Sequence, residues 1–226
     1  PARADDTRAR QEGSAAAPGN PVAAAQPGNA LRNRAPAAVA AALTSYHEHV
    51  LSILGDLDHG DFNDMLEPPV MADAARRQAL IPLLGQKIAL SETAMARIEA
   101  ATAALLTRLR AMPMEGFTAE EQRVFLTETQ TDADNAVPIY RAFVSATQLL
   151  LATSRELMNY LETPDGRPTL NPTTERMDFQ TQAAVDGYLD IAFRVDAAVA
   201  VFGLAVEMID DHQRNNQLPL LGGATP

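Results

Sequence analysis

The chain has 226 residues, a net charge of −11 and no cysteine, which excludes disulfide bonds, thiolate metal sites and a cysteine nucleophile. Phosphate backbones and anionic lipid headgroups repel so acidic a protein, which disfavours nucleic-acid binding and membrane binding through the folded body. Hydrophobic residues make up 46% of the chain and aromatic residues 5%, and this alanine- and leucine-rich composition predicts a single all-α domain.

Residues 1–36 are predicted to form a disordered tether rich in Ala, Pro and Gly. They contain almost no large apolar side chain, so they cannot bury enough surface to offset the entropy of ordering. The first residue is proline rather than methionine, which suggests that a segment upstream was removed. Such a stretch suits a link to a membrane anchor, the leader of a secreted effector, or an ordinary disordered terminus. Residues 217–226 are predicted to be a flexible tail.

Heptad spacing of apolar residues predicts four long helices, at about 37–59, 72–111, 119–161 and 181–214. We expect them to form an antiparallel bundle over residues 37–216. Two prolines fall inside this pattern. Pro82 predicts a kink or a break between 72–81 and 82–111, and Pro138 predicts a kink near Asn135. Thr118 and Glu121 have the spacing of a capping box, which predicts the start of the third helix.

The fourth helix is predicted from an apolar stripe without a polar interruption. Its last turn contains His212 and Arg214, which suit the negative end of the helix dipole. The stripe that should face the core consists of Val185, Tyr188, Ala192, Val195, Val199, Phe202, Val206 and Ile209.

Residues 162–180 form a long loop, and connections of this length usually have structure of their own or a function. Two interpretations are open. The segments 167–170 and 176–179 could pair as a small hairpin, or Asn171 could cap a helix that starts at Pro172. The charged residues of the loop could bind a protein partner or pair with one another. These candidates for an interaction loop are Asp165, Arg167, Arg176 and Asp178.

The acidic stretch 55–69 resembles a calcium loop in part. The oxygen ligands that the EF-hand pattern requires would be Asp56, Asp58, Asp64 and Glu67. Asp61 occupies the position that requires glycine, and Asn63 occupies the position of the small aliphatic residue. We therefore interpret the stretch as a helix stop at His59 and Gly60, one helical turn capped by Asp61, and a corner at Pro68-Pro69. No metal and no cofactor are predicted.

No catalytic residue is predicted, and we expect the protein not to be an enzyme. His47 and His49 are two residues apart, so they point to different sides of a helix and cannot bind one metal together. Both are expected to lie at the flank of the core, beside Tyr46. Asp210 and Asp211 are interpreted as a solvated helix end, because the further aspartate of prenyl-transfer enzymes is missing.

Residues 157–190 contain Tyr160-Leu161, Asp165-Gly166, Met177-Asp178-Phe179 and Gly187-Tyr188. With the soft tether and the helical bundle, this arrangement resembles small helical lipoproteins of the Gram-negative envelope. The resemblance implies an envelope location and no activity, and it requires a lipidated cysteine upstream of Pro1. Arginine supplies every basic residue except Lys87, a usage typical of GC-rich bacterial genomes.

These features favour a non-enzymatic bundle in the periplasm or cell envelope that acts through protein contacts, with a partner or with itself. Nucleic acid is not an expected partner, and the membrane is expected only through an anchor upstream of Pro1. Two alternatives are a ligand- or metal-responsive sensor bundle and a secreted effector with a disordered leader.

Overall fold

The computed structural model describes residues 31–57 and 62–215, and helices dominate this part of the chain. The all-α prediction is confirmed. A helical turn at residues 31–33 comes first. The remaining elements are α2 (Ala37–Gly55), α3 (Phe62–Met65), α4 (Pro68–Ala72), α5 (Ala74–Ala111), α6 (Ala119–Glu162), β1 (Thr169–Leu170), β2 (Met177–Asp178) and α7 (Gln182–Asn215).

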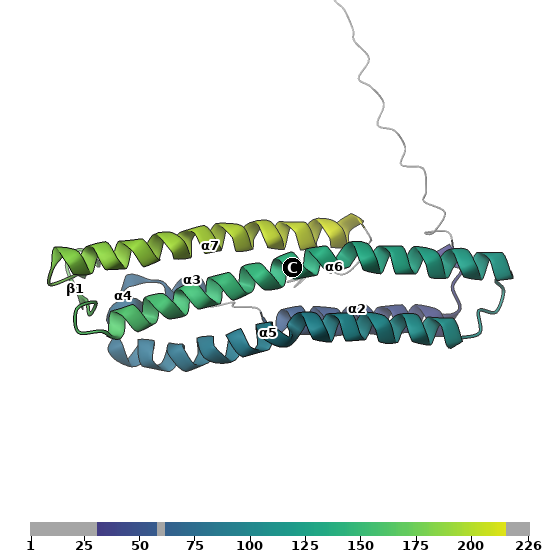
Figure 1. The fold of residues 1–226 in the computed structure, drawn as a ribbon, viewed down its shortest axis with the longest axis horizontal. Helices are drawn as coiled ribbons and strands as arrows, with labels where there is room; N and C mark the ends of the chain where they lie inside the picture. The colour runs from purple at the N-terminus through teal and green to yellow at the C-terminus, as the bar shows by residue number, and fades with distance from the viewer. Residues whose placement is uncertain (1–30, 58–61, 216–226) are drawn as a thin grey trace, which may run out of the picture.

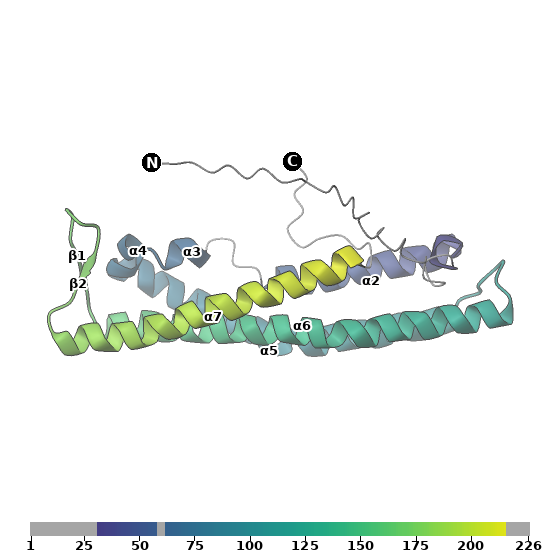
Figure 2. The ribbon, with the colours of Figure 1, turned by 90° about the horizontal axis from the view of Figure 1, so that it is seen from above.

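The long helices α5 and α6 form an antiparallel hairpin that sets the length of the molecule, and α7 returns along α6 (Figure 1). Several shorter helices together take the place of the fourth helix of the expected bundle. Figure 2 shows α2, α3 and α4 following one another on one side of the α5–α6 pair, while α7 crosses the pair obliquely. The expected bundle is therefore three long helices with a broken fourth.

Three clusters of buried side chains lie between these helices. The first, at the end of the α5–α6 turn, includes Val39, Leu109 and Phe125. The second, in the middle, joins all four layers and includes Ile53, Ile98, Val144 and Ile209. The third, at the hairpin end, includes Leu84, Leu151, Met158 and Val195. Together the three clusters form a core that runs along the whole rod. Each fully buried aliphatic side chain contributes about 1.5–3 kcal/mol to stability.

Side-chain caps fix where α5 and α6 begin. The predicted capping box is present, since Thr118 Oγ1 accepts from the Glu121 amide at 3.2 Å and Glu121 Oε2 accepts from the Thr118 amide at 2.8 Å. Asp73 caps α5 by accepting hydrogen bonds from the amides of Ala75 and Arg76. These bonds satisfy amides that have no partner within the helix.

Several predicted helix boundaries are wrong. Helix α2 ends at Gly55 rather than 59, and Pro68-Pro69 begins α4 instead of only ending a turn. Proline suits the first helical positions because its missing amide would have no partner there. The predicted stop at His59 and Gly60 and the cap at Asp61 lie outside the described residues.

Neither internal proline divides its helix. Helix α5 continues through Pro82 from Ala74 to Ala111, so of the predicted kink or break between 81 and 82 the break does not occur, and α6 continues through Pro138. Both prolines are exposed. Water can therefore bond the carbonyl that each proline leaves without an amide donor, which lowers the cost of keeping the helix.

The loop 162–180 contains a hairpin, the first of the two interpretations. Thr169 pairs with Asp178 and Leu170 with Met177 in an antiparallel ladder. The Asn171 side chain accepts hydrogen bonds from the amides of residues 173 and 174, so it stabilises the turn of the hairpin rather than starting a helix.

A tyrosine joins the end of α6 to the start of α7. Tyr160 donates its hydroxyl hydrogen to the carbonyl of Ala184 at 2.8 Å, across the hairpin loop. Gly187 leaves room for this contact, because a Cβ atom at that position would lie 2.5 Å from the Tyr160 hydroxyl.

The core face of α7 agrees with the predicted stripe only in part, since Val195 and Ile209 are buried and Tyr188, Phe202 and Val206 pack against the core. The buried residues are Ala184, Ile191, Val195, Ala198, Ala205, Ile209 and Gln213. Val199, a member of the predicted stripe, is exposed. Residues 197–206 contain no charge, so apolar periodicity alone does not select one face of this helix. The buried set includes small and large side chains, such as Ala198 and Ile191, while Phe193 and Leu204 are exposed.

Candidate functional site

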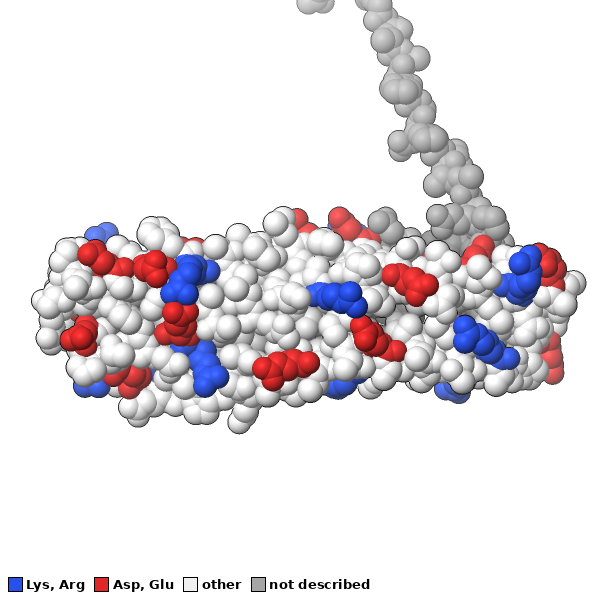
Figure 3. Space-filling model, in the orientation of Figure 1, with Lys and Arg blue, Asp and Glu red and all other residues white. Residues whose placement is uncertain are grey.

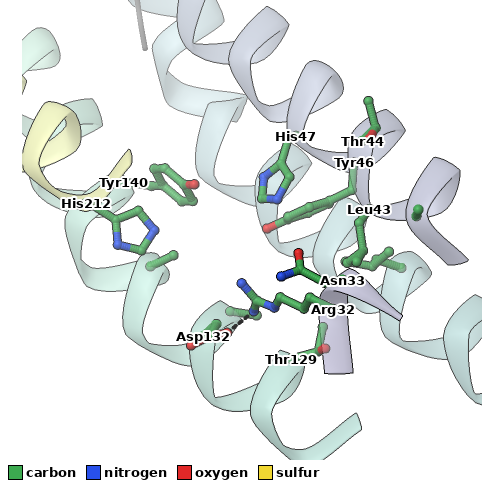
Figure 4. Close-up of a pocket in the computed structure, with 14 residues that line it drawn as sticks. Arg32, Asn33, Leu43, Thr44, Tyr46, His47, Thr129, Asp132, Tyr140 and His212 are labelled. Carbon is green, nitrogen blue, oxygen red and sulfur yellow. Dashed lines mark hydrogen bonds and ion pairs between the residues drawn. The ribbon is translucent and has the colours of Figure 1, made fainter. Parts of the chain in front are cut away.

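A cavity of about 310 Å³ lies where α2, α6 and the C-terminal end of α7 come together. This volume is at the lower end of the range for small-molecule sites. Ring and polar side chains contribute much of the wall, with small apolar side chains between them (Figure 4). The lining residues are Arg32, Asn33, Ala40, Leu43, Thr44, Tyr46, His47, Leu105, Thr129, Asp132, Ala133, Ala136, Tyr140 and His212.

The segment before α2 closes one side of the cavity. Arg32 forms an ion pair with Asp132 of α6, at the edge of the cavity. Two residues on, Arg34 binds Glu121 at 2.8 Å, and its guanidinium lies 5.7 Å from the centre of the Phe117 ring. These contacts hold residues 31–34 against the start of α6.

Two pairs of rings face each other across the cavity. On α2, the rings of Tyr46 and His47 have centroids 5.3 Å apart and are tilted. On the other side, the rings of Tyr140 of α6 and His212 of α7 meet edge to face at 6.1 Å. Figure 4 shows both imidazoles directed toward the space between the pairs. The two pairs come from three helices, so the cavity depends on tertiary packing.

The hydroxyl groups of this wall have defined directions. Thr102 Oγ1 donates to the carbonyl of Ile98 at 2.9 Å, so in its 2.9 Å bond to Tyr46 the tyrosine is the donor. Thr129 likewise donates to the carbonyl of Phe125 at 2.8 Å. The hydroxyls of Tyr46 and Thr129 are therefore left as acceptors toward the cavity.

Burial shifts the pKa values of the two histidines and two tyrosines of the cavity in the direction that favours their neutral forms. It lowers the pKa of His47 to about 4, and the positive charges of Arg32 and His212 act in the same direction. Burial also lowers the pKa of His212, partly offset by Asp132. The pKa of Tyr140 is raised by burial and by Tyr46, and burial raises the pKa of Tyr46 itself. At neutral pH both imidazoles and both phenols are therefore uncharged.

The sequence did not identify these histidines. His47 was expected at a flank and His212 at a solvated helix end, but both are half-buried in the cavity wall, whereas His49 is exposed. The sequence offered one indication of this site: His47 directly follows Tyr46, which was expected to belong to the core. Residues 32, 47, 132 and 212 meet only through packing of distant segments, which the spacing of residues within one helix does not reveal.

The acidic candidates for a metal site are dispersed. Asp56 binds the guanidinium of Arg97 at 3.1 Å, and its carbonyl accepts from Lys87 at 2.6 Å. Asp64 and Glu67 are exposed, and Asp58 lies outside the described residues. Within 31–57 and 62–215, no group of three or more His, Asp or Glu could hold a metal ion.

The candidates for an interaction loop all lie on the surface around the hairpin. Asp165, Arg167, Arg176 and Asp178 are exposed, and no ion pair joins any two of these four. Asp178 accepts a hydrogen bond from the side chain of Asn171 at 3.2 Å instead. A role of this loop in partner binding stays a prediction.

Large apolar side chains occupy the side of α7 opposite its core face. Phe193 is 69% exposed and Leu204 is 62% exposed, unusual values for such residues. We call this surface the α7 outer face, and it consists of Leu189, Phe193, Val201, Leu204 and Met208.

The neighbouring helix extends this apolar surface. Arg194 of α7 binds Glu156 of α6, so in antiparallel helices the residues two turns further along, Val201 and Leu149, also fall side by side. Leu149 is 47% exposed. Figure 3 shows a broad area without charged side chains in the middle of this side of the molecule.

Comparison with models of protein families, with curated proteins and with solved structures found no match to this chain. Among the described helices, none combines the length and the apolar character needed to cross a bilayer.

Proposed function

We propose that this protein is a non-enzymatic helical module that binds another protein through the α7 outer face. The exposure of Phe193 and Leu204 on one side of one helix carries the proposal. Contiguous exposed apolar residues on a folded protein mark interaction surfaces, whereas single ones need no explanation. Aromatic side chains such as Phe193 are typical anchors of protein interfaces.

The charges around this face indicate what kind of partner fits it. Along α7, exposed acidic residues border the apolar stripe: Asp186, Asp190, Asp196, Glu207 and Asp211. Two arginines lie among these acids: Arg194 binds Glu156 at 2.7 and 2.9 Å and contacts Asp190 at 3.4 Å, and Arg214 contacts Asp211 at 3.3 Å. The acids outnumber the arginines, so the border carries a net negative charge. We propose as partner an amphipathic helix whose apolar stripe is flanked by lysine or arginine.

A second copy of the chain fits this face less well. If two α7 helices paired antiparallel about the centre of the stripe, Asp190 of one copy would lie opposite Glu207 of the other. If they paired in parallel, each acidic residue would face its own equivalent. Either arrangement places like charges together, which disfavours association.

The experiment uses two labelled synthetic helices with identical leucine stripes, one flanked by lysines and the other by glutamates. Fluorescence anisotropy should show saturable binding of the lysine peptide to the wild type. Phe193→Ser should weaken it about 30-fold, the effect of losing a ~2 kcal/mol anchor residue. Leu83→Ser is the matched control, because Leu83 is an exposed leucine of α5 outside the α7 outer face.

Three results would contradict the proposal. The first is absence of saturable binding, and the second is equal binding of the glutamate peptide or of Phe193→Ser. The third is a dimer in light scattering that Phe193→Ser abolishes, because the occupant would then be a second copy. Export to the bacterial envelope stays a separate prediction, and fractionation of the native bacterium tests it.

A further inference from the structure

We propose that the cavity between α2, α6 and α7 binds a small, planar, uncharged molecule that both donates and accepts hydrogen bonds, such as a primary amide or a heteroaromatic base. The proposal does not depend on the α7 outer face. It concerns a different surface, since the residues of that face do not line the cavity.

The size of the cavity limits the ligand to a small molecule. A volume of about 310 Å³ corresponds to roughly ten water molecules at ~30 Å³ each. The polar lining would keep an unliganded cavity hydrated. A ligand that replaces this water gains affinity only if it also replaces the hydrogen bonds of the water.

The ring walls favour a flat ligand. The pair of Tyr46 and His47 and the pair of Tyr140 and His212 lie on opposite sides of the same space (Figure 4). Flat molecules gain from offset or edge-to-face contacts with rings at such distances. Between the rings, the small side chains of Ala40, Ala133 and Ala136 leave room.

The hydrogen-bonding groups of the wall call for a ligand with both donors and acceptors. The neutral imidazole of His47 has one donor and one acceptor nitrogen. Tyr46 and Thr129 offer only acceptor capacity to the cavity, because their hydrogens are directed elsewhere. The structure gives the Tyr140 hydroxyl no hydrogen bond to a described residue, so it can donate to a ligand.

The charges around the space disfavour ions of either sign. Arg32 and Asp132 are paired with each other, so neither offers a free counter-charge. The burial that lowers the pKa of His47 opposes a positive charge, and the burial that raises the pKa of Tyr140 opposes a negative one. A neutral molecule avoids both costs.

Three probes of nearly identical shape separate these possibilities: benzamide, benzoate and benzamidinium, which are neutral, negative and positive at pH 7. Binding is followed by NMR of the histidine side chains. Benzamide should move the His47 and His212 signals in a saturable way and leave His49, which is exposed, unchanged. Benzoate and benzamidinium should bind at least about tenfold more weakly.

A pair of alanines on α2 supplies the matched variants. Ala40 and Ala41 are both exposed, but only Ala40 lines the cavity. Ala40→Phe should fill the space and abolish benzamide binding, whereas Ala41→Phe should bind as the wild type does. An unchanged thermal melt of Ala40→Phe shows that it folds, and His212→Phe supplies a second test if it does not.

The proposal is overturned if benzamide shows no saturable effect up to its solubility limit. It is also overturned if benzoate binds as well or better, because the cavity would then be an anion site centred on Arg32. Equal binding by benzamidinium would indicate a cation site. Binding that persists in Ala40→Phe and in His212→Phe would place the probe elsewhere.

Discussion

Replacing Glu162 by glutamine is expected to destabilise the protein more than replacing its buried partner Arg77 by methionine. Arg77 is fully buried at the start of α5 and donates from Nε to Glu162 Oε1 at 2.7 Å. Its Nη1 donates to the carbonyl of Met71 at 2.5 Å. Its Nη2 is buried without a hydrogen-bond partner among the described residues.

The cost of the glutamine variant comes from the charge that it leaves behind. A guanidinium stays charged at any working pH, so Glu162→Gln leaves a buried cation without a counter-ion. Removing one partner of a buried ion pair costs about 3–5 kcal/mol. Because glutamine can still accept the bond from Nε, we expect the lower end, about 3 kcal/mol.

The methionine variant leaves less unsatisfied. The Glu162 side chain is 21% exposed and accepts a second hydrogen bond from Gln78 at 3.2 Å, so its charge can remain solvated without Arg77. Methionine fills a similar volume, and apolar replacement of buried ionic groups is often nearly neutral. The lost bond to the Met71 carbonyl costs about 1 kcal/mol.

Thermal unfolding measures the difference. A change of 1 kcal/mol shifts the Tm of a chain of this size by about 2–4 °C, so we expect losses of roughly 6–12 °C for Glu162→Gln and 2–4 °C for Arg77→Met. The double variant contains no charge at either position and should resemble Arg77→Met. Equal losses, or a larger loss for Arg77→Met, would refute the idea that an unpaired buried cation dominates.

Two further predictions concern acid and glycine. His47 has a pKa of about 4 in the folded protein against about 6.5 unfolded, so the unfolded state binds the extra proton and stability falls as the pH drops from about 6.5 to 4. In urea titrations, His47→Asn should remove up to about 3 kcal/mol of this loss of stability at low pH, whereas His49→Asn should leave the loss unchanged. Equal pH dependence of the two variants would contradict the prediction. Gly187→Ala should lower stability by about 2 kcal/mol because its Cβ would displace Tyr160, whereas Gly203→Ala, with nothing within 4 Å, should raise it by about 0.5–1 kcal/mol. The same urea titrations measure both, and a change of the same sign in the two variants would refute the assigned role of the tyrosine.

The helices were predictable where apolar and polar faces contrast. In α6 the heptad-spaced residues Tyr140, Val144, Leu151, Met158 and Leu161 are all buried. In α7 the prediction was right only in part: Val195 and Ile209 of the predicted stripe are buried but Val199 is exposed, because the uncharged run 197–206 does not mark which side faces solvent.

The cavity could not be predicted from local spacing. Its walls come from segments about 180 residues apart in the chain, between Arg32 and His212. For a histidine beside the apolar stripe of a helix, the sequence does not distinguish between exposure to water and contact with a neighbouring helix. The oblique path of α7 across the α5–α6 pair is seen in Figure 2, and His212 near the end of α7 lines the same cavity as His47 of α2.

The antiparallel pair of α5 and α6 separates the two ends of the described structure. The chain enters the described structure at Leu31, beside the α5–α6 turn, where Arg34 reaches the carbonyl of Gly116. The β1–β2 hairpin lies at the other end of α6, whose 44 residues extend about 66 Å. Leu31 and the hairpin therefore lie near opposite ends of α6, roughly two small-domain diameters apart.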